Sequence, residues 1–406
     1  MIRPRQNSSQ IGYKLVLFAV NPFLAALDSL RTIRDRQSVW ILYLWFLMFG
    51  IAFCAVNPDL DSSRYMEEFI RDKDISWENY SFMLEEYFTF DSIYKDIYTP
   101  TVNYIVSRFT DNYHWAFFVY AIVFGFFYVK SLLIFLRHSK VKNTIVFFML
   151  LFLFCLSNPI FNINGVRFWT AAWIGVYVAL SVFVEKRYLP LLLLPITQFI
   201  HNAFLIWMVV ILVAYCLRKF QSLVIVLFVL SSVVSAVSFL DILWDNVDML
   251  PEFLQRQVSA YTESEESVKK MSGQLAAQVP LYARILDALP AYFNLLMCYL
   301  LIFNRKKINK DKFAAGLLTA VLAMAATTNF LSSIPSVGRF TYMVIPILVV
   351  VWSMNYKYIK QYDKWFYLVP FIYSYKIWYI LRYTLSVTEL ELYTYPAPLT
   401  AYYYLF

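Results

Sequence analysis

The residues best suited to chemistry in this sequence are arginines that stand at the ends of apolar segments. Arg167 follows the turn-rich stretch "NPIFNING", and Arg339 has a matching place in "SSIPSVGRFTYM". A guanidinium group binds phosphate oxygens through two parallel hydrogen bonds and keeps its charge when it is partly dehydrated. The two arginines therefore indicate a clamp for a diphosphate. The alternative is that each arginine only anchors a helix at the membrane interface.

Three further side chains are candidate substrate ligands. Asn164 would add a hydrogen-bond donor beside Arg167, and Tyr342 follows Arg339 in the same segment. Arg284, in "PLYARILDAL", is a third cation with a weaker claim. An amphipathic helix lying on the membrane would also favour an arginine at that position.

His201 is the one histidine inside an apolar segment, where it occurs in "TQFIHN". A neutral imidazole can take the proton from a sugar hydroxyl while that hydroxyl attacks an anomeric carbon. A lone histidine is also common as a hydrogen-bonded core residue. Whether His201 could act as a base therefore depends on where the membrane topology places it.

Asp61 and Tyr65 lie four positions apart, so a helix would place them on one face. Asp59 and Asp61 also form an Asp-x-Asp, a pattern that can bind a metal–nucleotide complex, although a solvated acidic loop explains it equally well. The three histidines are far apart and the four cysteines lie in separate apolar runs. The sequence predicts free thiols, no metal site and no cofactor.

The composition indicates the environment that surrounds these residues. Hydrophobic residues make up 60% of the 406 positions and charged residues only 15%, whereas soluble domains carry about 25% charged residues. The sequence predicts an all-α polytopic membrane protein. Its net charge of +8 needs no nucleic-acid partner if the positive charges line one face of the membrane.

Apolar runs of suitable length predict about 10–11 transmembrane or re-entrant helices. The runs lie at 39–56, 115–136, 144–160, 168–184, 221–240, 289–303, 313–331, 340–354 and 365–381, with a longer run at 189–217. An N-terminal apolar piece, 11–27, is broken by Asn21 and Pro22 and is interpreted as an interfacial helix.

Loop charge predicts the orientation. The short loops are basic, whereas residues 57–114 hold 12 Asp and Glu against 5 Lys and Arg, and residues 241–288 hold 8 against 4. Because basic loops face the cytoplasm, we place the N-terminus inside and the two acidic loops outside. The basic loops on both sides of 189–217 then require that segment to enter the membrane and return, with its turn near 198–202. His201 is thus expected in an outward-facing cavity.

The order of these segments resembles the EpsG-like branch of the Wzy-type polysaccharide polymerases. The resemblance rests on the Asp-x-x-x-Tyr after the first span, "NGVRFWTAAWIGVYVAL", "FIHNAFLIWM" and "VGRFTYMVIPIL". Family members tend to have Glu-Pro in the first outer loop, where this chain has Thr99 and Pro100. A carboxylate role there is open, although Asp96 is close by.

The resemblance implies a GT-C-like bundle in the bacterial cytoplasmic (inner) membrane, with its active site facing the periplasm or exterior. The expected substrate is an oligosaccharide linked to undecaprenyl diphosphate, and no separate cofactor is implied. By resemblance, Arg167 and Arg339 would hold the diphosphate, His201 would be the base, and Asp61 and Tyr65 would shape the site. Membrane lipids, a chain-length regulator and a flippase are the candidate partners.

Two other functions remain open. An O-antigen ligase would use the same donor with a different acceptor, and a flippase or transporter would move the lipid-linked unit. The predicted organisation is common to all three. It comprises a cytoplasmic segment with an interfacial helix (1–38), a span (39–56), an outer loop (57–114), a bundle with the re-entrant break (115–240), an outer loop (241–288), a second bundle (289–381) and an outer tail (382–406).

Overall fold

The computed structural model describes residues 8–55, 60–89, 96–233, 280–331 and 337–406, and within these ranges every regular element is a helix. The predicted all-α membrane fold is confirmed. Asp59 and most of the predicted outer loop 241–288 lie outside the described residues.

Four helical stretches of the described chain are long and apolar enough to cross a membrane. They are His114–His138, Ile145–Phe183, Leu281–Phe303 and Lys312–Leu331. A helix pair bent by 81°, Gly338–Met354 with Tyr356–Phe366, becomes a fifth if it is counted as one span. Shorter apolar helices occur at Ile11–Val20, Arg36–Ile51, Leu189–Ile200, Phe204–Leu217 and Gln221–Val233.

The chain divides into two compact units, and each is described by itself. Unit 1 comprises Met1–Ser139, Phe154–Ile206 and Ile380–Phe406, and unit 2 comprises Lys140–Leu153 and Trp207–Tyr379. The helices of unit 1 are α1 (Ser8–Val20), α2 (Pro22–Arg31), α3 (Arg36–Ile51), α4 (Asp61–Asp72), α5 (Trp77–Thr89), α6 (Tyr98–Ser107), α7 (His114–His138), η1 (Ile160–Gly165), α9 (Val166–Phe183), η2 (Leu189–Leu192), α10 (Leu193–Ile200), α23 (Glu391–Thr394) and α24 (Ala397–Leu405).

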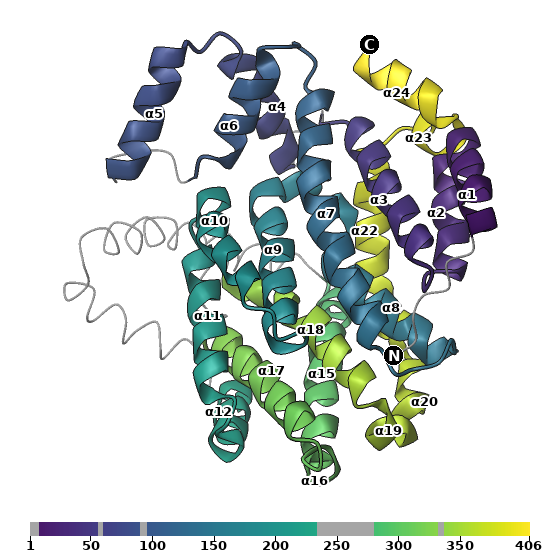
Figure 1. Cartoon of the computed structure of the whole chain (residues 1–406), viewed down its shortest axis with the longest axis vertical. Coiled ribbons are helices and arrows are strands. Elements are labelled where there is room, and N and C mark those ends of the chain that lie inside the picture. The colour runs from purple at the N-terminus through teal and green to yellow at the C-terminus, as the bar shows by residue number, and fades with distance from the viewer. Residues whose placement is uncertain (1–7, 56–59, 90–95, 234–279, 332–336) are drawn as a thin grey trace. The chain divides into compact units, whose positions relative to one another are not determined.

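Helix α7 is the centre of unit 1, where it packs between α3 and α9 (Figure 1). The approach to α3 is close at Gly50, because a Cβ atom there would lie 2.8 Å from the carbonyl oxygen of Phe117. Small residues allow such close helix packing where the hydrophobic effect offers little drive. Aromatic pairs add further contacts: the rings of Phe53 and Phe117 are stacked at 4.7 Å, and those of Tyr128 and Trp173 meet edge to face at 4.5 Å.

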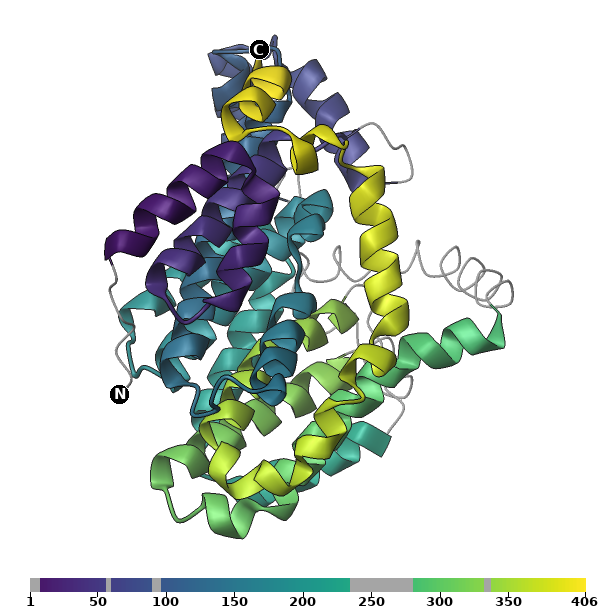
Figure 2. The same ribbon diagram turned by 90° about the vertical axis from the view of Figure 1, so that its right-hand side faces the viewer.

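The N-terminal part of unit 1 is a layer of three neighbouring helices, α1 to α3, shown in purple in Figure 2. The chain breaks between α1 and α2 at Asn21, whose side chain accepts a hydrogen bond from the Leu24 amide at 2.8 Å. Pro22 follows at the first helical position, where a missing N–H costs nothing. The Asn21–Pro22 pair therefore ends one helix and begins the next.

Unit 2 is built around α17, which packs against α12 and α18 (Figure 1). Its helices are α12 (Gln221–Val233), α15 (Leu281–Phe303), α16 (Arg305–Ile308), α17 (Lys312–Leu331), η4 (Val337–Phe340), α18 (Thr341–Met354), α19 (Tyr356–Ile359), η5 (Lys360–Tyr362), α20 (Asp363–Phe366) and α21 (Val369–Ile372). Three helices have residues in both units: α8 (Ile145–Ser157), α11 (Phe204–Leu217) and α22 (Ser374–Ser386).

The run 365–381, expected as one span, contains three helical pieces instead. Helix α20 ends at Phe366, α21 covers Val369–Ile372, and α22 begins at Ser374. Pro370 lies in the first turn of α21. A proline lacks a backbone N–H and its ring clashes with the preceding turn, so a continuous helix through this position is disfavoured.

Candidate active site

The turn before Arg167 is fixed by asparagine side chains. Asn158 Nδ2 donates to the carbonyl oxygen of Trp169 at 3.0 Å, and Asn162 Nδ2 donates to Asn158 Oδ1 at 2.8 Å. The indole N–H of Trp173 donates to the Asn158 carbonyl at 3.1 Å. These bonds tie the η1 turn to the start of α9. Arg167, in the first turn of α9, therefore projects from a rigid element.

Arg167 is held by two partners that come from distant parts of unit 1. Its Nη1 donates to Asp96 Oδ2 at 2.9 Å, and its Nε donates to the Tyr65 hydroxyl at 3.2 Å. The guanidinium also lies 5.5 Å from the centroid of the Tyr65 ring. Among the described residues Nη2 has no hydrogen-bond partner. Asp96 and Tyr65 thus orient the guanidinium group, and its Nη2 remains as a donor for an anion.

Asp96 is the anchor of this arrangement. Its side chain is only 2% exposed, against 25% for Arg167, and its Oδ1 is buried with no hydrogen-bond partner in the described part of the chain. Burial raises the pKa of the Asp96 carboxyl to about 6, because the loss of hydration outweighs the attraction of Arg167. The carboxyl can therefore gain or lose its proton near neutral pH.

Helix α4 supplies the second partner of Arg167. Tyr65 is buried, with 3% of its surface exposed, and burial raises the pKa of its phenol, so the hydroxyl stays neutral. Asp61, one turn earlier, is half exposed and has Arg64 Nη2 at 3.8 Å from its Oδ1. Its Oδ2 would lie 3.8 Å from a Cβ placed on Gly165. Asp61 therefore borders the turn that leads to Arg167.

Asn164 joins the same turn to α4. Its Oδ1 accepts a hydrogen bond from the Ser62 amide at 3.1 Å. Ser62 is the second residue of α4, where backbone N–H groups have no partner inside the helix. Asn164 thus caps α4 from another part of the chain. This contact gives the residue a positioning function in addition to the ligand role that the sequence predicted.

His201 occupies the break between α10 and α11. Helix α10 ends at Ile200, His201 has an extended backbone (φ −162°, ψ 117°), and α11 begins at Phe204. The imidazole Nδ1 accepts a hydrogen bond from the Ala203 amide at 3.2 Å. A neutral imidazole that accepts at Nδ1 carries its proton on Nε2. In this conformation His201 therefore presents Nε2 as a donor.

Contacts through neighbouring residues connect His201 with the Arg167 cluster. The His201 ring meets the ring of Phe168, the residue after Arg167, edge-on at 5.4 Å. The amide of Ile97, the residue after Asp96, donates to the Phe199 carbonyl at 3.1 Å. Segments 96–97, 167–168 and 199–201 of unit 1 therefore form one cluster.

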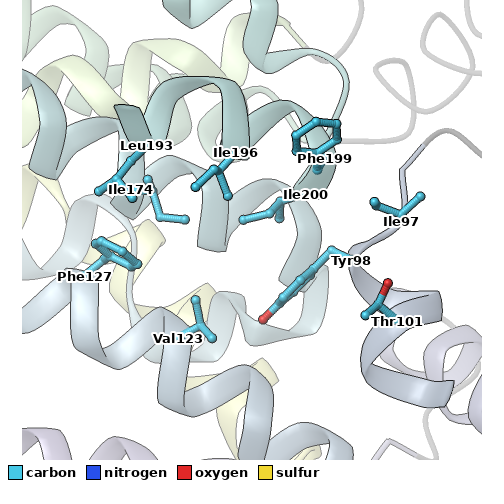
Figure 3. Close-up of a pocket in the computed structure, with 10 residues that line it drawn as sticks. All are labelled: Ile97, Tyr98, Thr101, Val123, Phe127, Ile174, Leu193, Ile196, Phe199 and Ile200. Atoms are coloured by element: carbon cyan, nitrogen blue, oxygen red, sulfur yellow. The ribbon is translucent and has the colours of Figure 1, made fainter. Parts of the chain in front are cut away.

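An apolar cavity of about 310 Å³ adjoins these segments (Figure 3). It is lined by residues of α6, α7, α9 and α10 together with the residue before α6. They are Ile97, Tyr98, Thr101, Val123, Phe127, Ile174, Leu193, Ile196, Phe199 and Ile200. The sequence patterns did not predict this cavity, because its walls come from four helices that are separated along the chain.

The other candidate residues belong to unit 2. Arg284 is exposed on α15, and Arg339 is exposed at the end of η4. Tyr342, in the first turn of α18, is 38% exposed, and its ring centroid lies 4.0 Å from Lys376 Nζ. Lys376, on α22, is a further cation that the sequence reading did not single out. Within the described residues, no group of three or more His, Cys, Asp or Glu side chains could hold a metal ion.

Long apolar helices and an arginine–aspartate pair at the start of one of them define an integral membrane protein with a polar cluster at its helix ends. The chain belongs to the EpsG family, whose model matches residues 38–396 and so includes every candidate residue named above. This confirms the family that the sequence motifs predicted. Membership supports a membrane function of the polysaccharide-polymerase type. No curated protein and no solved structure is detectably similar to the chain.

Proposed function

We propose that this protein polymerises a polysaccharide by transferring the growing glycan from undecaprenyl diphosphate onto an incoming lipid-linked repeat unit. The reaction would take place at the outer face of the bacterial cytoplasmic membrane. The observation that carries the proposal is the orientation of Arg167 by Asp96 and Tyr65, which leaves Nη2 for an anionic ligand. A guanidinium that is already oriented can bind a diphosphate oxygen through this remaining N–H group.

In the proposed reaction the acceptor hydroxyl oxygen attacks the anomeric carbon of the donor glycan. The bond from that carbon to the phosphate oxygen breaks, and undecaprenyl diphosphate leaves with the electron pair. Arg167 would bind a non-bridging oxygen and offset the negative charge that grows on the leaving group. From the sequence we add Arg339 as a second diphosphate ligand, with Arg284, Tyr342 and Asp61 as further substrate contacts.

The proton of the acceptor hydroxyl would pass to His201. An imidazole accepts a proton only at the nitrogen that has none, and in this conformation that nitrogen is Nδ1, which already accepts from Ala203. The proposed base must therefore release Ala203, or exchange its proton between the two ring nitrogens, when substrate binds. If neither change occurs, His201 would instead donate a hydrogen bond from Nε2 to the substrate.

The test is polymerisation by the purified full-length protein in lipid vesicles supplied with lipid-linked repeat units. The wild type should give a ladder of lipid-linked glycans. Arg167→Ala should lower the rate by about a hundredfold or more, because removal of one donor to developing charge has an effect of this size. Arg71→Ala is the matched control, since Arg71 is 68% exposed and its ion pair in the described part of the chain is with its neighbour Asp72.

Three results would contradict the proposal. A wild-type rate for Arg167→Ala would remove Arg167 from the reaction. Transfer of single glycans onto a non-repeat acceptor, with no longer lipid-linked chains, would indicate a ligase. Movement of intact lipid-linked units across the vesicle membrane without any glycan extension would indicate a flippase.

A further inference from the structure

The apolar cavity of unit 1 and the Arg167 cluster are built from the same chain segments. Ile97 lines the cavity and directly follows Asp96, and Ile200 lines it and directly precedes His201. On α9, Ile174 lies seven residues after Arg167. Seven residues are two helical turns, so both side chains lie on one face of α9, about 10 Å apart along its axis. The polar cluster and the cavity are thus built on adjoining parts of the same segments.

The lining of the cavity selects for an apolar occupant. Eight of its ten side chains are aliphatic or phenyl groups, and the others are Tyr98 and Thr101. The Thr101 hydroxyl is already paired with the Tyr80 hydroxyl at 2.9 Å. The Tyr98 hydroxyl points toward Val123 at the edge of the lining (Figure 3), and it is buried without a hydrogen-bond partner among the described residues, so it offers the cavity almost no polar surface. A sugar would leave most of its hydroxyl groups unpaired in this cavity, which is costly.

The cavity is built partly on helices whose length and composition suit a membrane span. Val123 and Phe127 belong to the span-length helix His114–His138, and Ile174 belongs to the span-length stretch Ile145–Phe183. The volume of about 310 Å³ is at the lower end for small-molecule sites, which hold about 300–1,000 Å³. The cavity can therefore hold a short, branched part of a longer chain.

We infer that this cavity binds the first isoprene units of the polyprenyl chain whose diphosphate lies at Arg167. The inference rests on the proposed function for the identity of the lipid, and it adds a binding site for the chain itself. Diphosphate and chain would be held by two successive parts of one α9 face, near Arg167 and near Ile174. By holding the chain on one side of the diphosphate, the cavity would help to position the anomeric carbon of the sugar that is attached on the other side.

The test measures binding of undecaprenyl diphosphate, without any sugar, to the full-length protein in nanodiscs. Ile196→Trp places a larger side chain in the cavity at a residue that is 46% exposed, so the core need not be overpacked. Leu192→Trp is the matched control, because Leu192 is 68% exposed on the neighbouring turn and does not line the cavity. Ile196→Trp should weaken binding about tenfold or more, since a misfit of even one methylene group in a hydrophobic pocket has an effect of about 10–200-fold.

Two control variants should bind undecaprenyl diphosphate about as tightly as the wild type. Leu192→Trp should stay within about twofold of the wild type, as substitutions at exposed positions usually do. Tyr98→Phe should also stay within about twofold, because an apolar chain cannot pair with the hydroxyl. Clear weakening by Tyr98→Phe would overturn the inference in favour of a polar occupant.

A second measurement uses the wild type alone and so does not depend on the folding of a variant. The probe is a polyprenyl diphosphate with a photoreactive diazirine in its first isoprene units. Cross-links should fall on peptides that contain 97–101 and 193–200, and unlabelled undecaprenyl diphosphate should compete for them. Cross-links elsewhere, or equal competition by phosphatidylglycerol, would overturn the inference, the latter because it would indicate an ordinary acyl chain.

Failure of the inference and failure of the proposed function give different results. If the wild type polymerises glycans and Ile196→Trp binds the lipid as tightly as the wild type, only the chain site is refuted. A protein that is labelled in the cavity but forms no glycan ladder supports the chain site and refutes only the polymerase.

Discussion

The guanidinium of Arg167 donates to the carboxylate of Asp96 at 2.9 Å, although the two residues are 71 positions apart in the chain. The aspartate is nearly inaccessible and the arginine is partly exposed. The pair is therefore anchored at its acidic end, and the open end of the guanidinium points away from that anchor. A substrate anion would meet a cation whose direction is already fixed.

Asp96→Asn tests this positioning role. The amide preserves the size of the side chain but loses the charge, so we expect the polymerisation rate to fall about tenfold to a hundredfold. If Asp96 acts through Arg167, the double variant with Arg167→Ala should be no slower than Arg167→Ala alone. Initial rates of ladder formation measure both effects. Asp72→Asn is the control, since Asp72 is also buried beside an arginine but pairs with Arg71 at the C-terminal end of α4.

The raised pKa of Asp96 predicts a pH dependence. With a pKa of about 6, against about 3.9 in an unfolded chain, the carboxyl binds its proton more tightly in the folded state. Its contribution to the free energy of unfolding should therefore increase as the pH falls through 6 and level off below about 4. Protonation also removes the charge that holds Arg167, so the rate should decline below pH 6.

Comparison with Asp96→Asn isolates this group from other titrating residues. The variant should lack the acidic decline of the rate, and its unfolding temperature relative to the wild type should fall as the pH is lowered. The measurements are the polymerisation rate and the unfolding temperature of both proteins, from about pH 4.5 to about pH 8. Parallel profiles for the two proteins would contradict the assignment.

The two roles proposed for His201, as a base or as a hydrogen-bond donor, predict different activities for His201→Gln and His201→Asn. Glutamine can place an N–H near the position of Nε2, and asparagine can place an oxygen near that of Nδ1. If Nε2 only donates a hydrogen bond, His201→Gln should keep activity within about tenfold of the wild type. If His201 is the base, both variants should lose about a hundredfold or more, because neither amide takes up a proton.

Asn164 offers a test that separates positioning from substrate binding. Asn164→Ala removes the acceptor for the Ser62 amide at the start of α4, so it should lower the free energy of unfolding by about 1 kcal/mol. Asn164→Asp should retain that stability, because a carboxylate also accepts from an amide. Thermal unfolding gives the measurement. An unchanged stability of Asn164→Ala together with a raised KM would show that the residue contacts substrate and does not support α4.

Several features of the site could be predicted because each depends on a short stretch of sequence. The turn residues of "NPIFNING" followed by an apolar run place Arg167 at a helix start, and α9 begins at Val166. The polar stretch around His201 in an apolar segment coincides with the end of α10 at Ile200. Asp61 and Tyr65 lie one turn apart on α4, as their spacing implies. Local hydrogen bonding and helical period are enough for such predictions.

The partner of Arg167 could not be predicted in this way. Asp96 lies in an acidic loop with eleven other carboxylates, and no periodicity distinguishes it from them. Its one local signal is its position just before the helical segment that contains Thr99 and Pro100. The bond between Ile97 and Phe199 brings this segment to the end of α10, and that pairing depends on contacts between distant parts of the chain.

The sequence by itself determined that this is an all-α membrane protein, because composition and apolar run length leave the chain no soluble alternative, and its motifs carried the resemblance to the EpsG family. It also determined which residues stand at helix ends, since capping and breaking are local effects. Only the tertiary structure decided that Arg167 faces Asp96 and Tyr65, that Asn164 caps α4, and that four helices line an apolar cavity beside them. These relationships depend on side-chain packing between distant segments, and no short-range pattern in a sequence encodes that packing.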